Sequence, residues 1–296
     1  MAWGPTSMSD TVPAVNGGRL RVRKTYKLYI GGAFPRSESG RSYPVRGADG
    51  TLLAHAAQAS RKDVRDAVVA ARKTQPGWAK ATAYNRGQVL YRVAEMLDGR
   101  REQFAAEVAA AGDEPSTVDT AIDRWVWYAG WADKYAQVAG ASNPVAGPYF
   151  NFSLPEPTGV VGVLAPQESS LLGLVSVIAP VIVTGNTTVV VAAEERPLPA
   201  ISLAEVLATS DLPGGVVNLL TGRTAELAPW LASHRDVNAI DLTGASAAAR
   251  PELQRAAAEN VKRVYVPRHT DWAADPGTSR LAAFVETKTV WHPIGV

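Results

Sequence analysis

Cysteine is absent from the 296 residues of this chain. Without a thiol, the chain cannot form a disulfide, hold zinc or an iron–sulfur cluster through thiolates, or use a cysteine nucleophile. An excess of one charge is also missing, because 30 lysines and arginines face 28 acidic residues and leave a net charge of +2. So small a charge gives no general attraction to nucleic acid or to an anionic membrane. The sequence therefore predicts neither as a partner.

Long hydrophobic runs are lacking as well. The longest apolar stretch, 171–183, has 13 residues and contains Pro180, whereas a membrane-spanning helix needs ~20. Residues 1–20 have neither the basic start nor the apolar core of a signal peptide. We therefore expect a cytoplasmic protein in which residues 1–24 form a flexible tail.

Several catalytic and phosphate-binding motifs are missing too. The chain has no P-loop and no GxGxxG motif, and residues 244–248 approach a GxSxG elbow but lack its final glycine. The four histidines show no metal-ligand spacing, so we predict no metal site. Glu194 and Glu195 could act as a general-base pair, although adjacent carboxylates at a strand end are more often simply solvated.

What the chain does contain, from residue 160 onward, is a regular alternation of apolar strands and helices. The strands are predicted at 160–165, 188–192, 216–220, 237–242 and 262–266, and the helices at 171–183, 199–209, 224–234 and 246–260. Near-continuous apolar strands with short connections indicate a parallel sheet covered on both faces. The predicted fold is therefore α/β, a doubly wound five-stranded sheet, and such sheets bind ligands at the carboxyl ends of their strands.

The first half of the chain reads as short extended pieces followed by helices. Residues 26–58 are predicted to be extended, with a hairpin turn at Asp49-Gly50. Ser60 and Asp63 predict the start of a helix over 61–73, which ends before Pro76-Gly77. Two longer helical patterns follow at 83–111, interrupted near Gly99, and at 116–138. The second carries an aromatic stripe, which we interpret as core packing rather than a ligand platform: Trp125, Tyr128, Trp131 and Tyr135.

Several short motifs between residues 25 and 266 recur together in one known family. They are Lys27-Leu28-Tyr29-Ile30-Gly31-Gly32, the run 156–163 (EPTGVVGV), Ile178-Ala179-Pro180, Gly185-Asn186-Thr187, the run 212–218 (LPGGVVN), Thr221-Gly222 and Thr243-Gly244. Through them the chain resembles the aldehyde dehydrogenase superfamily. The resemblance implies a Rossmann-like nucleotide-binding domain formed by residues 25–142 and 155–266.

The C-terminal segment adds a second resemblance. Residues 284–291 (FVETKTVW) are similar to the family's oligomerisation strand, so residues 143–154 and 280–296 are expected to form a β arm. In the family a whole catalytic domain lies between the fifth sheet strand and that strand, whereas here only residues 267–280 separate them. The chain is thus similar to the degenerate second half of family-16 aldehyde dehydrogenases, with the catalytic domain absent.

The family's catalytic positions are changed in this sequence. Glu168 stands at the position of the oxyanion-hole asparagine, and Pro267 stands at that of the general-base glutamate. Losing one oxyanion donor typically costs ~10²–10³ in rate, and a carboxylate there would repel the developing negative charge. Together with the missing cysteine nucleophile, these changes argue against the family's aldehyde oxidation, so we assign no catalytic residue.

The cofactor positions are only partly kept. The residues that the resemblance leaves for NAD are Pro166, Glu194, Gly222, Thr243 and Gly244. Val191 replaces the family's ribose-binding lysine, Ala245 replaces a serine that contacts the pyrophosphate, and Ala249 replaces a glycine that opens the next helix. We therefore expect NAD to bind weakly or not at all.

These observations favour a non-catalytic partner subunit. It would assemble through the arm with a complete NAD(P)-dependent aldehyde dehydrogenase, or with itself, since an exposed strand edge invites a further strand. Two alternatives stay open: an NAD-dependent oxidoreductase acting on an aldehyde, alone or completed by a partner, and an NAD-binding sensor.

Overall fold

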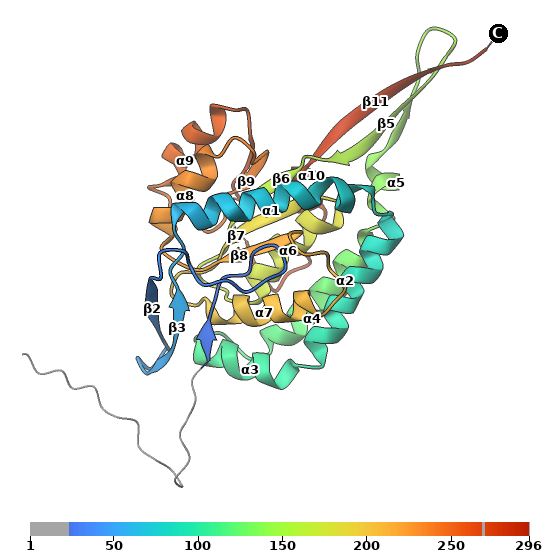
Figure 1. Ribbon diagram of the computed structural model, residues 1–296. Coiled ribbons are helices and arrows are strands. Elements are labelled where there is room, and N and C mark those ends of the chain that lie inside the picture. Colours follow the sequence, from blue (N-terminus) through green and yellow to red (C-terminus); the bar gives the residue numbers. More distant parts are fainter. Residues whose placement is uncertain (1–23, 268–269, 296) are drawn as a thin grey trace, which may run out of the picture.

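The structure is a computed structural model that describes residues 24–267 and 270–295. Of the predicted flexible tail, residues 1–24, only Lys24 lies within the described residues. The described chain forms a body of helices and strands from which a long, narrow arm projects (Figure 1).

The centre of the body is a five-stranded sheet in which every neighbouring pair of strands is parallel. In spatial order its strands are β10 (Arg263–Tyr265), β9 (Ala239–Asp241), β6 (Val160–Leu164), β7 (Thr187–Val191) and β8 (Val217–Leu220). The predicted parallel sheet is confirmed. The chain order reverses beside β6, so the carboxyl ends of β6 and β9 flank the point at which such sheets usually bind ligands.

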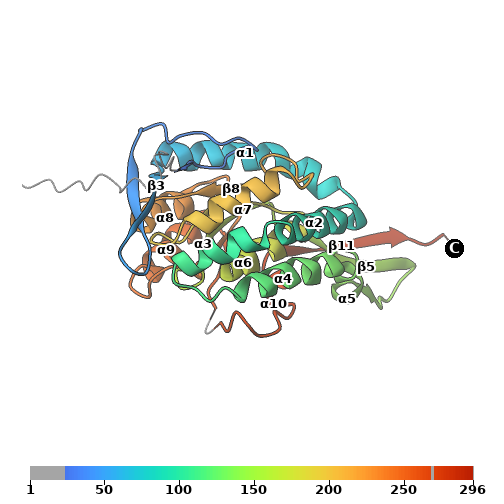
Figure 2. The same ribbon diagram turned by 90° about the horizontal axis from the view of Figure 1, so that it is seen from below.

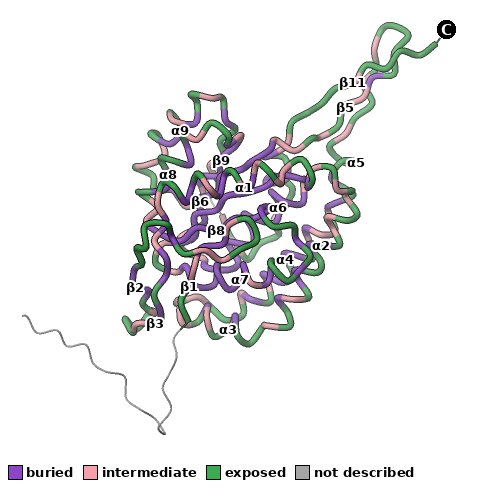
Figure 3. Tube along the Cα trace, viewed as in Figure 1, coloured by how far each residue is buried: buried purple, intermediate pink, exposed green. Residues whose placement is uncertain are grey.

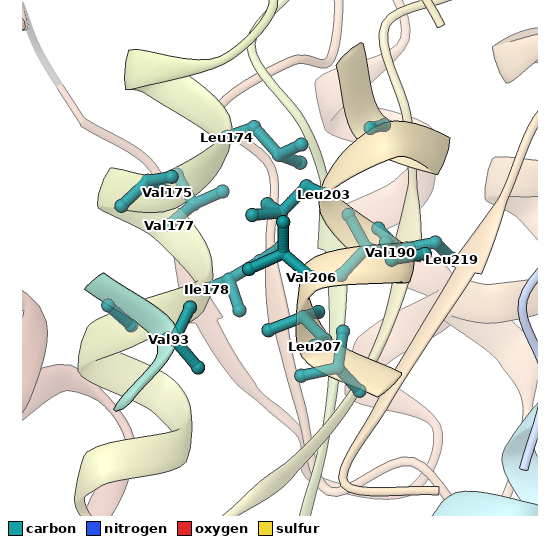
Figure 4. Packing of buried hydrophobic residues seen from close by; sticks show 14 of the residues in the cluster. Val93, Leu174, Val175, Val177, Ile178, Val190, Leu203, Val206, Leu207 and Leu219 are labelled. Atoms are coloured by element: carbon teal, nitrogen blue, oxygen red, sulfur yellow. The ribbon is translucent and has the colours of Figure 1, made fainter. Parts of the chain in front are cut away.

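Helices cover both faces of this sheet, which confirms the doubly wound fold. One face packs against α6 (Leu172–Val183) and α7 (Leu198–Ala208), and the other packs against α1 (Arg61–Lys80), α8 (Thr224–Ser233) and α9 (Arg250–Ala258). Successive strand residues point to opposite faces, so Val190 joins the first layer while Val189 and Val191 join the second. Figure 4 shows Val190 and Leu219 against α6 and α7.

The remaining helices form an outer layer over α6 and α7 (Figure 2). They are α2 (Ala83–Asp98), α3 (Arg101–Ala110), α4 (Thr117–Trp131) and α5 (Tyr135–Ala139). Trp125 and Tyr128 of the aromatic stripe are fully buried, which confirms that the stripe packs in the core. Every residue of α6 is buried, and no helix in the described part of the chain is long and apolar enough to cross a membrane.

A small second sheet forms the amino-terminal edge of the body. Its strands, in the order β1-β3-β2, are β1 (Thr25–Tyr26), β3 (Leu52–Ala57) and β2 (Ser42–Arg46). Helix α1 then begins at a complete capping box, in which the Ser60 side chain accepts from the Asp63 N–H and the Asp63 carboxylate accepts from the Ser60 N–H.

The predicted end of this first helix before Pro76-Gly77 is wrong, because α1 continues to Lys80 with Pro76 inside it. Trp78 is buried, and its indole N–H donates to the carbonyl oxygen of Ile182 at 2.7 Å. This packing against α6 offsets the helix hydrogen bond that a proline cannot donate.

The arm is a three-stranded antiparallel sheet in the order β11-β5-β4. Its strands are β4 (Ala141–Asn143), β5 (Tyr149–Pro157) and β11 (Val285–Pro293), against expected arm segments of 143–154 and 280–296. Helix α10 (Ser279–Ala283) precedes β11 and anchors it, because Leu281 and Phe284 are fully buried in the body. Beyond this anchor the arm is mostly exposed (Figure 3).

A buried lysine lies at the start of β10. Only 7% of Lys262 is exposed, and its ammonium group donates to the Asn260 side-chain oxygen. Burial lowers the pKa of Lys262 to about 8, from 10.5. The folded state therefore holds this proton less tightly than the unfolded state does, which destabilises the fold wherever the lysine is charged.

We predict that Lys262→Met raises the free energy of unfolding at pH 7. The gain should shrink as the pH rises from about 8 towards 10.5, because the unfolded parent then binds the proton that the folded parent has lost. Urea unfolding across this range measures the effect, with Lys80→Met, at an exposed lysine, as the control. A gain that does not change with pH would contradict the prediction.

Candidate functional site

A cavity of about 480 Å³ opens beside the carboxyl ends of β6, β7 and β9, between α8 and α9. Its walls combine apolar side chains with several carboxylates. The lining residues are Leu164, Gln167, Glu194, Glu195, Thr224, Ala225, Ala228, Pro229, Gly244, Ala245, Ser246, Ala249, Glu252 and Leu253. This is where the fold predicts a ligand, and the volume suits a small molecule.

Glu194 forms part of the cavity wall, just after β7. One carboxylate oxygen accepts from Arg223 at 2.7 Å, and the other accepts from the backbone N–H of Thr224 at 2.9 Å. Thr224 is the first residue of α8, so Glu194 satisfies a free amide at the helix start in place of a local cap. Hydrogen bonding to this carboxylate raises the pKa of the Arg223 guanidinium. Glu194 therefore has a structural role in the described chain.

The backbone of Glu194 is also held firmly. Its N–H donates to the Gln167 side-chain oxygen at 2.9 Å, and its carbonyl oxygen accepts from the Tyr43 hydroxyl at 3.2 Å. Burial raises the pKa of Tyr43 above its ordinary value, so the hydroxyl stays a donor at neutral pH. Segments after β6 and β7, and the β2 strand, thus position one side of the cavity.

Gly244 closes the cavity at the end of β9. Its N–H donates to the carbonyl oxygen of Leu164 at 2.9 Å, and a β-carbon on Gly244 would lie 1.9 Å from the carbonyl oxygen of Ala165. A side chain cannot fit there without moving the backbone. The glycine therefore allows the loop after β9 to lie against the end of β6.

The other three predicted cofactor residues lie near the cavity but do not line it. Gly222 precedes Arg223 and has a φ of +147°, with a β-carbon position 3.1 Å from the backbone nitrogen of Ala59. Thr243 is turned towards Arg280, whose guanidinium donates to its hydroxyl at 3.1 Å. Pro166 is buried and packs beside Gly173 at the start of α6. The structure thus brings only Glu194 and Gly244 of the five into one cavity wall.

Sequence reasoning missed several residues of this cavity. Gln167 and Arg223 hold Glu194, and Glu252 adds a carboxylate from the first turn of α9. Arg223 directly follows the predicted Gly222, so its position in the turn before a helix was the available signal. Glu252 carried none, because an acidic residue in a first helical turn is common.

Three carboxylates line the cavity, those of Glu194, Glu195 and Glu252, and no lysine or arginine is among its described lining residues. Arg223 lies just outside this wall and pairs with Glu194 at 2.7 Å and with Glu195 at 3.4 Å, which compensates part of the negative charge. Helix α9 offers few free donors, since Ala249 and Arg250 donate their N–H groups to Ser246 and Pro251 has none. Val191, at the lysine position, is fully buried in the sheet. The arrangement suits an uncharged or cationic group with apolar surface and disfavours a polyphosphate.

The position that the resemblance gives to an oxyanion donor is occupied differently. The Glu168 carboxylate is exposed and accepts from the indole N–H of Trp272 at 2.9 Å. The described residues contain no cluster of histidine and acidic side chains that could hold a metal ion. The hydroxyl-bearing residues in the lining of the cavity described above are Thr224 and Ser246.

Comparison with known proteins gives a consistent result. Residues 35–267 match the aldehyde dehydrogenase family. The chain is 32% identical over 259 residues to the cytosolic 10-formyltetrahydrofolate dehydrogenase of Mus musculus, covering 83% of this chain and 28% of that protein. It is also 32% identical over 255 residues to retinal dehydrogenase 2 of Homo sapiens, covering 83% of this chain and 48% of that protein.

The folds agree as well. The NAD+ complex structure of aldehyde dehydrogenase from Bacillus cereus superposes with a TM-score of 0.77 at 27% identity, over 81% of this chain and 50% of that chain. The present chain thus spans about half the length of this structure and of the retinal dehydrogenase, and less of the formyltetrahydrofolate enzyme.

We predict that Gly244→Ala lowers the free energy of unfolding by about 2–3 kcal/mol, because the added methyl group collides with the carbonyl of Ala165. Gly99→Ala is the matched control, since Gly99 has φ of −61° and its β-carbon position is 3.6 Å from the nearest atom. Chemical denaturation compares the two. Equal stability of both variants would contradict the close approach of these loops.

Proposed function

This chain belongs to the aldehyde dehydrogenase family, and from that premise we propose that it is a non-catalytic partner subunit. It assembles through its β arm with a complete, cysteine-bearing aldehyde dehydrogenase. In that role it stabilises the enzyme or covers part of its surface. The observation that carries the proposal is the arm itself, whose outer edge and one apolar face have no partner within the described chain.

The chemistry supports a non-catalytic role. The family's mechanism needs a thiol nucleophile, and these 296 residues contain none. Between β10 and β11 the chain has only residues 266–284, and of these Leu281 and Phe284 are buried in the body. At the expected oxyanion position Glu168 offers a carboxylate bonded to Trp272 rather than a neutral donor. The proposal is therefore that a second chain supplies the chemistry.

One face of the arm carries a cluster of apolar side chains. Cross-strand pairing places Val290 opposite Phe152, and the side chains alternate between the two faces, so Phe150 and Leu154 share this face with their cross-strand partners His292 and Lys288. Phe150 and Leu154 are 49% and 44% exposed, and neighbouring exposed apolar side chains of this kind often mark an interaction surface. This surface and the neighbouring edge of β11 are what a partner strand or sheet would cover.

The hydrogen-bond register identifies the free backbone groups on β11. Phe284 accepts from the Thr158 N–H at 3.2 Å, and Ile294 donates to the Pro148 carbonyl at 2.8 Å. Because antiparallel pairs alternate between bonded and non-bonded residues, the even-numbered positions of β11 face β5. The backbone N–H of Thr287 therefore points to the outer edge, where it is available to another strand.

We predict that Thr287→Pro weakens assembly by roughly tenfold or more, because it removes an edge donor and blocks strand addition. Thr287→Ala is the matched control, since it changes the same side chain but keeps the N–H. The measurement is the native mass and affinity of the purified chain mixed with a complete aldehyde dehydrogenase from the same organism.

Four outcomes are distinguishable. Loss of the mixed species with proline but not with alanine supports pairing through the β11 edge. Equal assembly of both variants contradicts this geometry. Recovery of an oligomer of this chain alone replaces the enzyme with a second copy as the partner, and a monomer in every mixture overturns the proposal.

A second candidate function is nucleotide binding, which the 480 Å³ cavity favours. The Bacillus cereus relative was solved as an NAD+ complex, and here the apolar walls of α8 and α9 fit an adenine ring while Glu194 is placed to accept from ribose hydroxyls. The pyrophosphate does not fit as well, since three carboxylates line the cavity and Ala245 stands where the family has a serine that contacts the pyrophosphate. We therefore infer that NAD binds weakly and that its adenosine part supplies the affinity.

We predict that adenosine binds at least as tightly as NAD+, because it lacks the phosphates that these carboxylates repel. Glu252→Gln should strengthen NAD+ binding and leave adenosine binding unchanged, whereas Glu259→Gln, at the C-cap of the same helix and outside the cavity, should alter neither. Titration calorimetry measures both ligands with the parent and with each variant. A low micromolar dissociation constant for NAD+ in the parent chain would contradict weak binding.

A further inference from the structure

A second cavity of about 220 Å³ lies on the opposite face of the sheet, between α4, α6 and residues 270–280. It is smaller and differs in charge from the cavity beside α9. Two arginines and three aromatic side chains contribute to its lining, together with Ser176: Arg124, Tyr128, Tyr265, Trp272 and Arg280.

Arg124 is a buried cation without a carboxylate partner. Only 5% of it is exposed, and its guanidinium donates to neutral acceptors: the Ser176 hydroxyl at 3.1 Å and the carbonyl oxygens of Trp272 and Ala274 at 2.8 and 3.0 Å. Among residues 24–267 and 270–295, no carboxylate lies within 4 Å of it, and Asp275 acts on it only from farther away. Burial lowers the pKa of Arg124, and the charge of Asp275 acts in the opposite direction. A buried charge is costly unless an opposite charge accompanies it.

Arg280 brings a second guanidinium to the same cavity. It is 5% exposed and pairs with the buried Asp241 carboxylate at 2.5 Å. Its guanidinium carbon lies 4.8 Å from the Tyr265 ring centre and 5.5 Å from that of Trp272. Because a guanidinium has five N–H donors, this arginine keeps donors that Asp241 and Thr243 do not use.

The Tyr128 hydroxyl is the third polar group. It is buried and has no hydrogen-bond partner within the described part of the chain, which is uncommon for a buried hydroxyl. Burial raises the pKa of Tyr128 to about 12, while the charges of Arg280 and Arg124 act in the opposite direction. The hydroxyl thus remains a donor close to two cations.

We propose that this cavity binds a small organic carboxylate between Arg124 and Arg280. The carboxylate would supply the missing counter-charge for Arg124 and an acceptor for the Tyr128 hydroxyl, and the rings of Tyr265 and Trp272 would contact its carbon skeleton. The aromatic walls favour an organic acid over inorganic phosphate, which has no apolar part.

Two exposed carboxylates, Asp271 and Asp275, also contribute to the lining. Each accepts from a backbone N–H in its own turn, Asp271 from Ala273 and Asp275 from Gly277. They oppose the entry of an anion and so limit its affinity. The proposal therefore predicts the direction of a change in affinity, because removing one of these negative charges should strengthen the binding of an anion.

The test uses the full chain titrated with acetate, butyrate and benzoate, and with phosphate and chloride at matched ionic strength. Calorimetry and thermal unfolding report binding. We expect saturable binding of butyrate or benzoate, weakened roughly tenfold or more by Arg124→Gln and strengthened by Asp275→Asn. Arg92→Gln, at an exposed arginine of α2, is the control and should have no effect.

Tyr128→Phe provides a second variant that keeps the core volume if Arg124→Gln does not fold. This variant should bind the carboxylate ligand more weakly than the parent chain and should keep the same fold. Equal binding of phosphate and benzoate would replace the organic acid with any small anion. The proposal is overturned if no carboxylate binds saturably at millimolar concentration. It is also overturned if the Arg124 and Tyr128 variants bind the carboxylate with the same affinity as the parent chain.

Discussion

The buried pair between Arg280 and Asp241 is the interaction on which the functional half of the molecule depends. Asp241 is fully buried at the end of β9, where its second oxygen accepts from the Thr243 N–H at 2.9 Å. Breaking such a pair leaves an uncompensated charge, so the pair fixes residues 270–284 over the end of the sheet. That segment builds the arginine-lined cavity and, through α10, sets the direction in which β11 leaves the body.

The two cavities at this edge of the sheet carry different charged groups. Beside α9 the wall has three carboxylates, two of which pair with Arg223, and beside α4 it has two buried guanidiniums together with the exposed Asp271 and Asp275. The family's fold alone does not determine this difference, since a fold carries many unrelated sites. It results from particular residues, such as Glu252 on one side and Arg124 on the other.

Local signals made the sheet predictable, while long-range contacts determined the rest. Five apolar strands and the Ser60–Asp63 capping box are readable because each depends on neighbouring residues. Helix α1 continues beyond its predicted end before Pro76 because Trp78 packs on α6, which comes much later in the chain. For the same reason the pairing of Glu194 with Arg223, and the meeting of Arg124 with Arg280, needed the folded topology.

The arm joins segments that are far apart in the chain, since Val285 pairs with Pro157. Closing so long a loop costs entropy that the arm's own contacts repay only after the body has formed, so the arm should be the last element to fold. During synthesis, β5 can pair only with the short strand β4 until β11 has left the ribosome, and its other edge stays open. Display of the arm thus reports that the intervening chain has been made and folded, and a product interrupted before β11 would lack the surface needed to join a complex.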